Sequence, residues 1–457
     1  MNTKVDTINI LVVLWSVFFV LDILYIYLRK NGLILLGIFN IFIFYYFIFI
    51  YFGSLILLLK FDTFSVEILG MVNDKTLRIL VFLTTIFFLF AIMAALLADY
   101  IFGIKKDILI KWIKKDIISF SPNNDKFIII PIIFFFLMSI IIFIYYLSKI
   151  PLIPILGVFL NIGPMRLRAE AVGDLFEGKI WWYRYFYLNI PIFLSFVIII
   201  EGFQNKSYLL RLLRFLLILY CFFINIFDVQ KAPLLFYLFF LFLIYHYIHK
   251  KNVKINFKNI LMYTIMALSL LTTMYIYFMG RDFSIAIVEG FHRVFTGQLQ
   301  GLYGIIENFT NRPLYGRTLP PFLLKVFGLD FYNLDKEMKL YIHKYINPNS
   351  SIIGLAPTVY FGEVYANFGL IACFLSMFLI PFILRSIDCL FIKRIDKSSL
   401  SIGLYIYMMW HYKNLVLGRL SPFIFDISVV LILFIYFILL LIKNFINLLK
   451  HRREPHE

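Results

Sequence analysis

The sequence predicts an all-α polytopic membrane protein with about 11 transmembrane helices. Of its 457 residues, 62% are hydrophobic and only 15% are charged, whereas soluble domains are nearer to half apolar and about a quarter charged. The apolar residues occur in runs long enough to cross a bilayer as helices. The short connections that alternation places on one side of the bundle are all basic, as expected for cytoplasmic loops.

The apolar runs predict membrane spans of roughly 17–25 residues. The second is longer, which suggests a tilted helix or one that begins at the interface. The first ends in Arg29 and Lys30 and lacks a preceding basic segment and a cleavage site, so we interpret it as a retained anchor. The predicted spans are 8–28, 33–59, 79–99, 127–149, 184–202, 209–227, 232–248, 258–279, 367–386, 399–416 and 421–442.

The basic loops set the predicted orientation, because cytoplasmic connections are enriched in Lys and Arg. The strongest is IKKDILIKWIKKD, residues 104–116. Placing it in the cytoplasm puts the N-terminus outside and the C-terminus inside; an even count with both ends inside is the alternative. The chain is then one integral membrane domain, 1–457, with a first outer loop at 150–183 and a large outer loop, with amphipathic helices, at 280–366. Topology accounts for most of the net charge of +17, and no nucleic-acid surface is indicated.

Several motifs are absent from the sequence. It contains no P-loop, HExxH, CxxC or GxSxG motif, and its three cysteines lie in or at the ends of apolar spans. We therefore expect no cofactor and no metal. An enzyme of this kind would use an already activated substrate outside the membrane.

The outer loops carry the candidate binding residues. Arg166 and Arg168 follow Pro164 and suit an oxyanion clamp, because guanidinium binds two oxygens at once; headgroup anchoring is the alternative. Arg281 and Arg293 flank an amphipathic helix that would lie on the bilayer or under a lid. A turn-rich loop, NRPLYGRTLPPF, carries Arg312 and Arg317.

Three further residues lie at predicted membrane edges. Glu363 precedes the span at 367–386 and suits a general base; a carboxylate that complements a helix dipole is the alternative. Lys231 lies at the mouth of a span and is a functional candidate, or else pairs locally with Asp228. Arg419 is a weaker candidate. Asp22 and Asp426 are the clearest intramembrane charges.

The layout and four stretches resemble the Wzy-type O-antigen polymerases, also called oligosaccharide repeat unit polymerases, which are GT-C-like membrane glycosyltransferases. The matching stretches are MRLRAEAVG, QKAPLLFYL, RPLYGRTLPPFL and PTVYFGEVYANFGLIA. The related O-antigen ligases have a His where this chain has Glu363. A paired Arg-x10-Gly motif is not found in both loops, so the resemblance does not assign the arginines individually.

The resemblance implies polymerisation of undecaprenyl-pyrophosphate-linked oligosaccharide units into O-antigen or capsule. This would occur at the periplasmic face of the bacterial inner membrane, with membrane lipid and a chain-length regulator as partners. Glu363 would be the catalytic base. The pyrophosphate would be bound by cations that converge with Glu363. Those from the outer loops are Arg166, Arg168, Arg281, Arg293 and Arg317, and those at membrane edges are Lys231 and Arg419. The alternatives are an O-antigen ligase and a flippase or transporter, which would need charges lining the bundle interior.

Overall fold

The structure is a computed structural model. It describes residues 6–31, 37–62, 64–120, 126–160, 164–173, 175–176, 178–205, 207–229, 231–249, 269, 272–273, 276, 282–310, 312–350, 353–424 and 426–451. Nearly all of the secondary structure in these ranges is helical. The extended pairing found there is one isolated bridge between Ile118 and Ser398. The predicted all-α class is confirmed.

Within the described ranges, 8 helices are long and apolar enough to cross a membrane, as expected for a multi-pass protein. The predicted span 232–248 contains a shorter apolar helix, Ala232–Tyr245, and 399–416 forms α19 (Ser399–Tyr412) followed by a short 3-10 helix. Most of the span 258–279 lies outside the described residues, so a count of about 11 stays a prediction. The 8 helices are Thr7–Arg29, Ile38–Leu58, Asp74–Ile101, Ile129–Leu147, Ile180–Gln204, Tyr208–Ile226, Tyr360–Arg394 and Ser421–Ile446.

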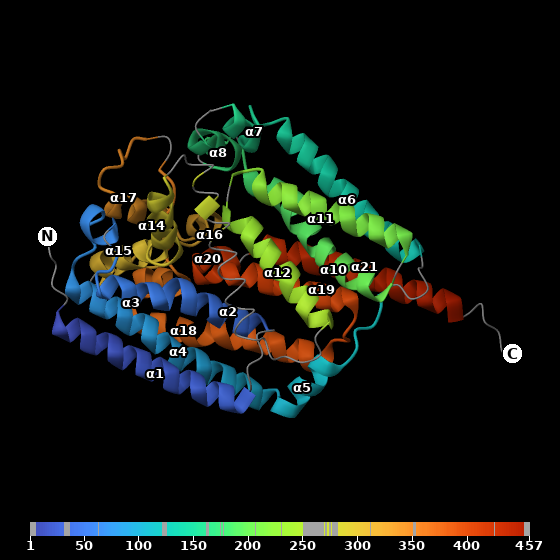
Figure 1. Ribbon diagram of the computed structural model, residues 1–457, viewed down its shortest axis with the longest axis horizontal. Helices are drawn as coiled ribbons and strands as arrows, with labels where there is room; N and C mark the ends of the chain where they lie inside the picture. Colours follow the sequence, from blue (N-terminus) through green and yellow to red (C-terminus); the bar gives the residue numbers. More distant parts are fainter. Residues whose placement is uncertain are drawn as a thin grey trace. The chain divides into compact units, whose positions relative to one another are not determined.

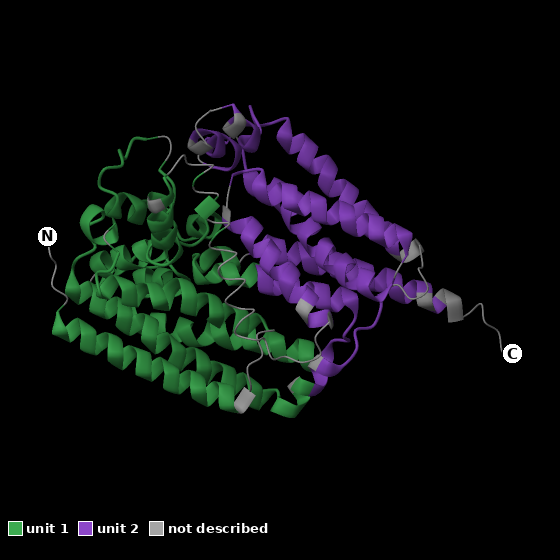
Figure 2. Ribbon diagram, in the orientation of Figure 1, with its two compact units in different colours: residues 1–110, 253–393, 411–425 green, residues 111–252, 394–410, 426–457 purple. Residues whose placement is uncertain are grey.

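The chain divides into two compact units, each assembled from segments that are distant in sequence (Figure 2). Unit 1 comprises residues 1–110, 253–393 and 411–425. Unit 2 comprises residues 111–252, 394–410 and 426–457. The two outer loops predicted from sequence therefore belong to different units: 150–183 lies in unit 2 and 280–366 in unit 1.

Long apolar helices form the body of unit 1, and α1 and α3 both pack along α4 (Figure 1). The aromatic rings between them give this body its core. Tyr46 and Phe87 stack with ring centroids 3.7 Å apart, and Phe361 lies 6.2 Å from each. The start of α18 is thereby held against two other helices. The body comprises α1 (Thr7–Asn31), α2 (Ile38–Tyr46), α3 (Phe52–Leu58), α4 (Asp74–Ile101) and α18 (Tyr360–Arg394).

Shorter amphipathic helices gather at one end of unit 1 (Figure 1), and α15 packs on both α17 and α4. Two glycines make the close approaches possible. A Cβ on Gly301 would lie 2.2 Å from the Pro357 carbonyl oxygen, and one on Gly304 would lie 3.0 Å from the Met338 sulfur. These helices are α14 (Phe283–Val294), α15 (Gln300–Phe309), α16 (Pro321–Val326) and α17 (Leu334–Ile342).

Unit 2 is built around α10, which is buried from Ile190 to Gly202. This nearly continuous apolar run has no polar face to offer water, so neighbouring helices surround it: α10 packs on α11, α12 and α6, and α6 also packs on α21. The elements are α6 (Lys126–Leu147), α7 (Pro154–Phe159), α8 (Pro164–Val172), α9 (Ile180–Arg184), α10 (Ile190–Gln204), α11 (Tyr208–Ile226), α12 (Lys231–His249) and α21 (Ile427–His451).

Candidate functional site

Glu363 lies in the first turn of α18, which begins at Tyr360 rather than at the predicted position 367. The backbone breaks at Gly369, whose φ of 79° and ψ of −169° form a combination that is open essentially to glycine alone. A short helical segment, 360–368, therefore precedes the part of α18 that follows the break. Glu363 belongs to this segment.

The loop that carries Arg312 and Arg317 is hydrogen-bonded to the end of the short segment. Leu314 N–H donates to the Ala366 carbonyl at 2.9 Å, and Tyr315 N–H donates to the Asn367 carbonyl at 3.0 Å. The break at Gly369 makes these carbonyls available, because the last carbonyls of a helix lack partners in the following turn. Two of the stretches that carry the family resemblance are thus joined in one folded unit.

The Glu363 carboxylate is buried, with 3% of the residue exposed, and both of its oxygens are bound. The Thr318 hydroxyl donates to Oε1 at 2.6 Å, and Ser421 N–H donates to Oε2 at 3.0 Å. The Asn367 amide in turn donates to the Thr318 oxygen and to the Glu363 carbonyl, each at 2.8 Å. We call these four residues the Glu363 socket.

A second carboxylate, Asp335, lies beside the socket in the first turn of α17. Its Oδ2 forms an ion pair with Arg419 Nε at 2.9 Å, and its Oδ1 accepts the Thr358 hydroxyl at 3.0 Å. Burial raises the pKa of Asp335. Arg419 and Thr358 oppose that rise, the Glu363 charge adds to it, and the net shift is upward. The two acids are therefore close enough to interact.

This arrangement can accept a proton and bind an oxyanion at neighbouring points. Each Glu363 oxygen holds one donor, and a carboxylate oxygen has room for a second. Arg419 Nη1 is buried and has no hydrogen-bond partner among the described residues, so the guanidinium keeps a donor after pairing with Asp335. Arg419, a weaker candidate from sequence, therefore lies in the best-formed part of the site.

The other predicted cations of unit 1 are more exposed. Arg317 is fixed through its backbone, because its N–H donates to Leu314 and its carbonyl accepts Tyr332 N–H at 2.8 Å. Its side chain is exposed, and Arg317 directly precedes Thr318 of the socket in the sequence. Arg293 is exposed in the last turn of α14. Arg281 lies outside the described residues.

Unit 2 presents Arg166 and Arg168 on α8, where both are exposed. Arg166 Nε pairs with Glu170 at 2.9 Å, one helical turn later; such exposed pairs contribute about 0.3–0.5 kcal/mol. The opposite side of α8 is anchored, because Leu167 and Ala171 are buried and the Tyr146 hydroxyl donates to the Ala171 carbonyl at 2.6 Å. The convergence of these arginines with Glu363 stays a prediction.

Lys231 begins α12, and the structure describes its backbone only. The neighbouring Asp228 is largely buried and forms an ion pair with Arg184, whose Nη2 lies 3.4 Å from Oδ2. Sequence reasoning missed Arg184. The available signal was a guanidinium at the first position of an apolar run, where a charge needs a partner.

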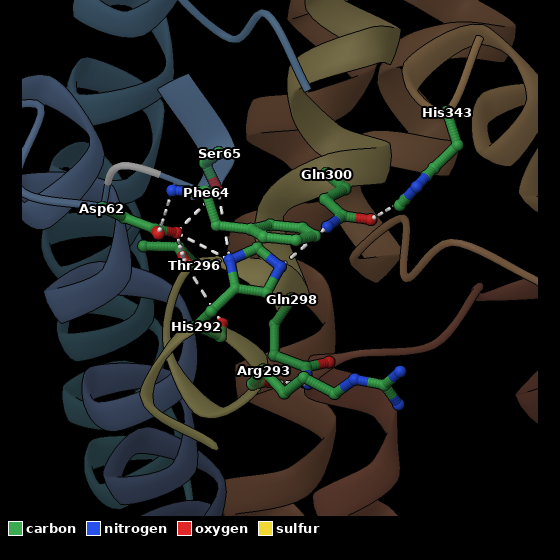
Figure 3. A network of polar contacts seen from close by, with 9 residues as sticks. All are labelled: Asp62, Phe64, Ser65, His292, Arg293, Thr296, Gln298, Gln300 and His343. Carbon is green, nitrogen blue, oxygen red and sulfur yellow. Dashed lines mark hydrogen bonds and ion pairs between the residues drawn. The ribbon is translucent and has the colours of Figure 1, made fainter. Parts of the chain in front are cut away.

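Sequence reasoning also missed a buried network around Asp62 and His292 (Figure 3). His292 Nδ1 lies 2.7 Å from Asp62 Oδ2, and the Ser65 and Thr296 hydroxyls donate to the same oxygen. Burial opposes ionisation of Asp62, but hydrogen bonds from His292, Thr296 and Ser65 outweigh it and lower its pKa. Asp62 and His292 are 230 residues apart, so no local motif reveals the pair.

Charges are buried inside the apolar helices of unit 1, contrary to the expectation that Asp22 and Asp426 are the clearest intramembrane charges. Arg385, 2% exposed, pairs with Asp99 at 2.8 Å and with Asp388 at 3.6 Å. Asp388 also accepts the first N–H groups of α2, from Ile38 and Phe39. Asp22 itself is exposed. The spacing of Arg385 and Asp388, three residues apart on one helical face, was the signal for this cluster.

No family model matches the chain, and no curated protein or solved structure is significantly similar to it.

Proposed function

We propose that this chain is a membrane glycosyltransferase that polymerises lipid-pyrophosphate-linked oligosaccharide repeat units at the periplasmic face of the bacterial inner membrane. The observation that carries the proposal is the Glu363 socket. Two sequence stretches that resemble the polysaccharide polymerases, 312–323 and 357–372, are hydrogen-bonded to each other around one buried carboxylate. The Ser421 N–H that binds this carboxylate lies two residues after Arg419, whose guanidinium keeps an unpartnered donor.

In the proposed reaction, Glu363 accepts the proton of a sugar hydroxyl on the next lipid-linked unit. The freed oxygen forms a bond to the anomeric carbon of the growing chain. The bond from that carbon to the lipid pyrophosphate breaks, and the pyrophosphate leaves with the electron pair. The Thr318 hydroxyl, 2.6 Å from Glu363 Oε1, already occupies the position from which such a hydroxyl would donate, so the acceptor would replace it.

Cationic side chains would stabilise the charge on the leaving pyrophosphate. Preorganised donors aimed at a developing charge commonly contribute several kcal/mol, on the order of 2.7–4 for one donor. Arg419 has the unpartnered Nη1, and Arg317 is exposed beside Thr318. Arg166 and Arg168, which are exposed on α8, stay predicted pyrophosphate-binding residues. The partners would be the undecaprenyl-pyrophosphate-linked oligosaccharide, membrane lipid and a chain-length regulator.

The test replaces Glu363 by Gln, which removes the base and keeps the shape. We expect cells with Glu363→Gln to lose the polysaccharide ladder and to retain lipid that carries a single repeat unit. Glu337→Gln, which changes an exposed acid on α17, is the matched control and should keep the ladder. In one orientation the introduced amide places its N–H groups against Ser421 N–H, where two donors repel each other. Size-exclusion chromatography of the purified variant must therefore also show that it is folded. A normal ladder in folded Glu363→Gln would exclude Glu363 as the base.

A transporter or flippase of lipid-linked oligosaccharide is the second candidate. The buried cluster of Asp99, Arg385 and Asp388 favours it, because ionisable groups inside membrane helices often mark transport paths. Reconstituted vesicles separate the two functions. Movement of labelled lipid-linked oligosaccharide across the bilayer without chain extension indicates the transporter, and extension without movement indicates the polymerase.

A further inference from the structure

An apolar segment follows the loop that carries Thr318 of the Glu363 socket. We call residues 321–331, with the sequence PFLLKVFGLDF, the apolar finger. It comprises α16 and the residues after it up to Phe331. The Tyr332 N–H donates to the Arg317 carbonyl at 2.8 Å and closes the base of the finger. The finger therefore begins and ends beside the residue that precedes Thr318.

Leu324 anchors α16, and the other large side chains of the finger are turned outwards. Leu324 is 1% exposed, whereas Val326 is 77% exposed. Two residues apart in a helix means about 200° around its axis, so Val326 lies nearly opposite Leu324. After the helix, Phe327 is 68% exposed, and Leu329 and Phe331 are exposed as well. Proteins that are surrounded by water seldom leave such a group of apolar side chains uncovered.

The long part of α18 shows what covers apolar side chains elsewhere in unit 1. α18 is one of the helices that are long and apolar enough to cross a membrane. After the break at Gly369, exposed apolar residues recur along it at intervals of four, so they lie along one side of the helix. In a helix that crosses a bilayer, such a side faces lipid. These residues are Ile371, Leu375, Leu379 and Ile383.

Phe368 connects this side of α18 to the base of the finger. It lies just before the break and is exposed. A Cβ on Gly316 would lie 3.7 Å from Phe368 Cζ, and the Gly316 N–H donates to the Asn367 side-chain oxygen at 3.0 Å. Gly316 directly precedes Arg317, whose carbonyl closes the finger. The exposed apolar surface at the start of the membrane helix is therefore continued by the finger.

The charges around the finger suit the surface of a bilayer. Arg317 at its base and Lys325 within α16 are exposed cations, and Asp330 is an exposed acid. The cations outnumber the acid, which favours contact with anionic headgroups. Exposed apolar residues next to cations are typical of segments that lie in the membrane interface. The finger is too short to cross the hydrocarbon, so it would lie in one face of the bilayer.

We propose that the apolar finger inserts into the bilayer surface and binds membrane phospholipid. Val326 and Phe327 contact acyl chains, while Lys325 and Arg317 lie among the headgroups. Because Thr318 follows Arg317 directly, insertion holds the Glu363 socket at the level of the headgroups. The benefit for catalysis rests on the proposed function: the pyrophosphate of a lipid-linked substrate lies at the same level and reaches the socket while its lipid stays in the bilayer.

The test attaches an environment-sensitive fluorophore to Phe327→Cys in the full-length chain, reconstituted in vesicles of phosphatidylethanolamine and phosphatidylglycerol. The native thiols Cys221, Cys373 and Cys389 are buried, so brief labelling of the folded chain favours the introduced thiol. The matched control is the same label on Glu337→Cys, at an exposed acid of α17. The quenchers are phospholipid with a nitroxide on its acyl chain, and aqueous iodide.

We expect the lipid nitroxide to quench the Phe327→Cys label roughly twofold or more above the control, because interfacial apolar residues lie about 5–10 Å into the headgroup and acyl boundary. Iodide should quench the control more strongly. Equal quenching of both labels by iodide overturns the inference, since the finger is then in water. Protection from both quenchers also overturns it, because a second copy of the chain or another protein then covers the finger.

A second label tests the orientation of α16. Lys325→Cys changes the residue next to Val326, and its label should be quenched most by a nitroxide on the lipid headgroup, whereas the Phe327→Cys label responds most to the acyl-chain nitroxide. The same depth for both labels would refute the assigned orientation.

Polymer synthesis is a separate measurement. A chain with an inserted finger that makes no polymer keeps the inference and refutes the proposed function. A chain that makes polymer with its finger in water does the opposite.

Discussion

Replacing Thr318 by Val tests whether the Glu363 socket holds this part of unit 1 together. Valine has nearly the shape of threonine, so the change removes one hydroxyl and leaves no cavity. Glu363 Oε1 loses its donor at 2.6 Å, and the Asn367 amide loses its acceptor at 2.8 Å but keeps the Glu363 carbonyl. A hydrogen bond to a charged group contributes about 1.5–3 kcal/mol. We expect the free energy of unfolding to fall by about 2–3 kcal/mol.

The buried cysteines provide the assay. Cys221, Cys373 and Cys389 are buried free thiols, and two of them lie in α18 itself, which carries Glu363. A thiol-reactive fluorophore therefore reports the temperature at which these helices open in detergent. Thr318→Val should lower that temperature, whereas Thr318→Ser keeps the hydroxyl and should restore most of the loss. Equal midpoints for Thr318→Val and the unmodified chain would show that the hydroxyl contributes nothing to stability.

Two further predictions use the same assay. At Gly369 a new Cβ meets no atom within 4 Å, but φ is 79° and ψ is −169°, a combination essentially confined to glycine. Gly369→Ala should therefore cost roughly 1–3 kcal/mol through backbone strain alone. Gly369→Asn should cost about as much, because asparagine tolerates the left-handed helical region but not this one, and equal stability of all three chains would contradict the break in α18. Burial holds the His343 pKa at about 4, below its ordinary 6.5, so between these values the unfolded chain binds more protons and stability must decline as pH falls from about 6.5 towards 4. His343→Gln should flatten that decline, and an equally steep decline in His343→Gln would place its cause elsewhere.

Sequence periodicity located the helices well, because length and apolar content decide which segments can cross a bilayer. It also found the amphipathic segments that became α14 and α15, and it selected Glu363, Arg317 and Arg419 of unit 1. It could not predict which side chains contact one another. In the sequence, Asp335 looks like an ordinary acid at a helix start, and only the fold pairs it with Arg419. Asp62 likewise shows no special pattern, and only the fold places it against His292. Such pairings depend on tertiary contacts between segments that carry no shared local pattern.

The spacing of Asp335, Lys339 and His343 has a consequence for how this protein can vary. Inserting one residue between Asp335 and His343 would turn everything beyond it by about 100° around the helix axis. His343 would then point away from Gln300, whose amide oxygen lies 2.8 Å from its Nε2, or Asp335 would point away from Arg419, its ion-pair partner at 2.9 Å. Substitutions at Lys336 or Glu337 leave this register intact. Among relatives, these nine positions should therefore tolerate changes of side chain far better than changes of length.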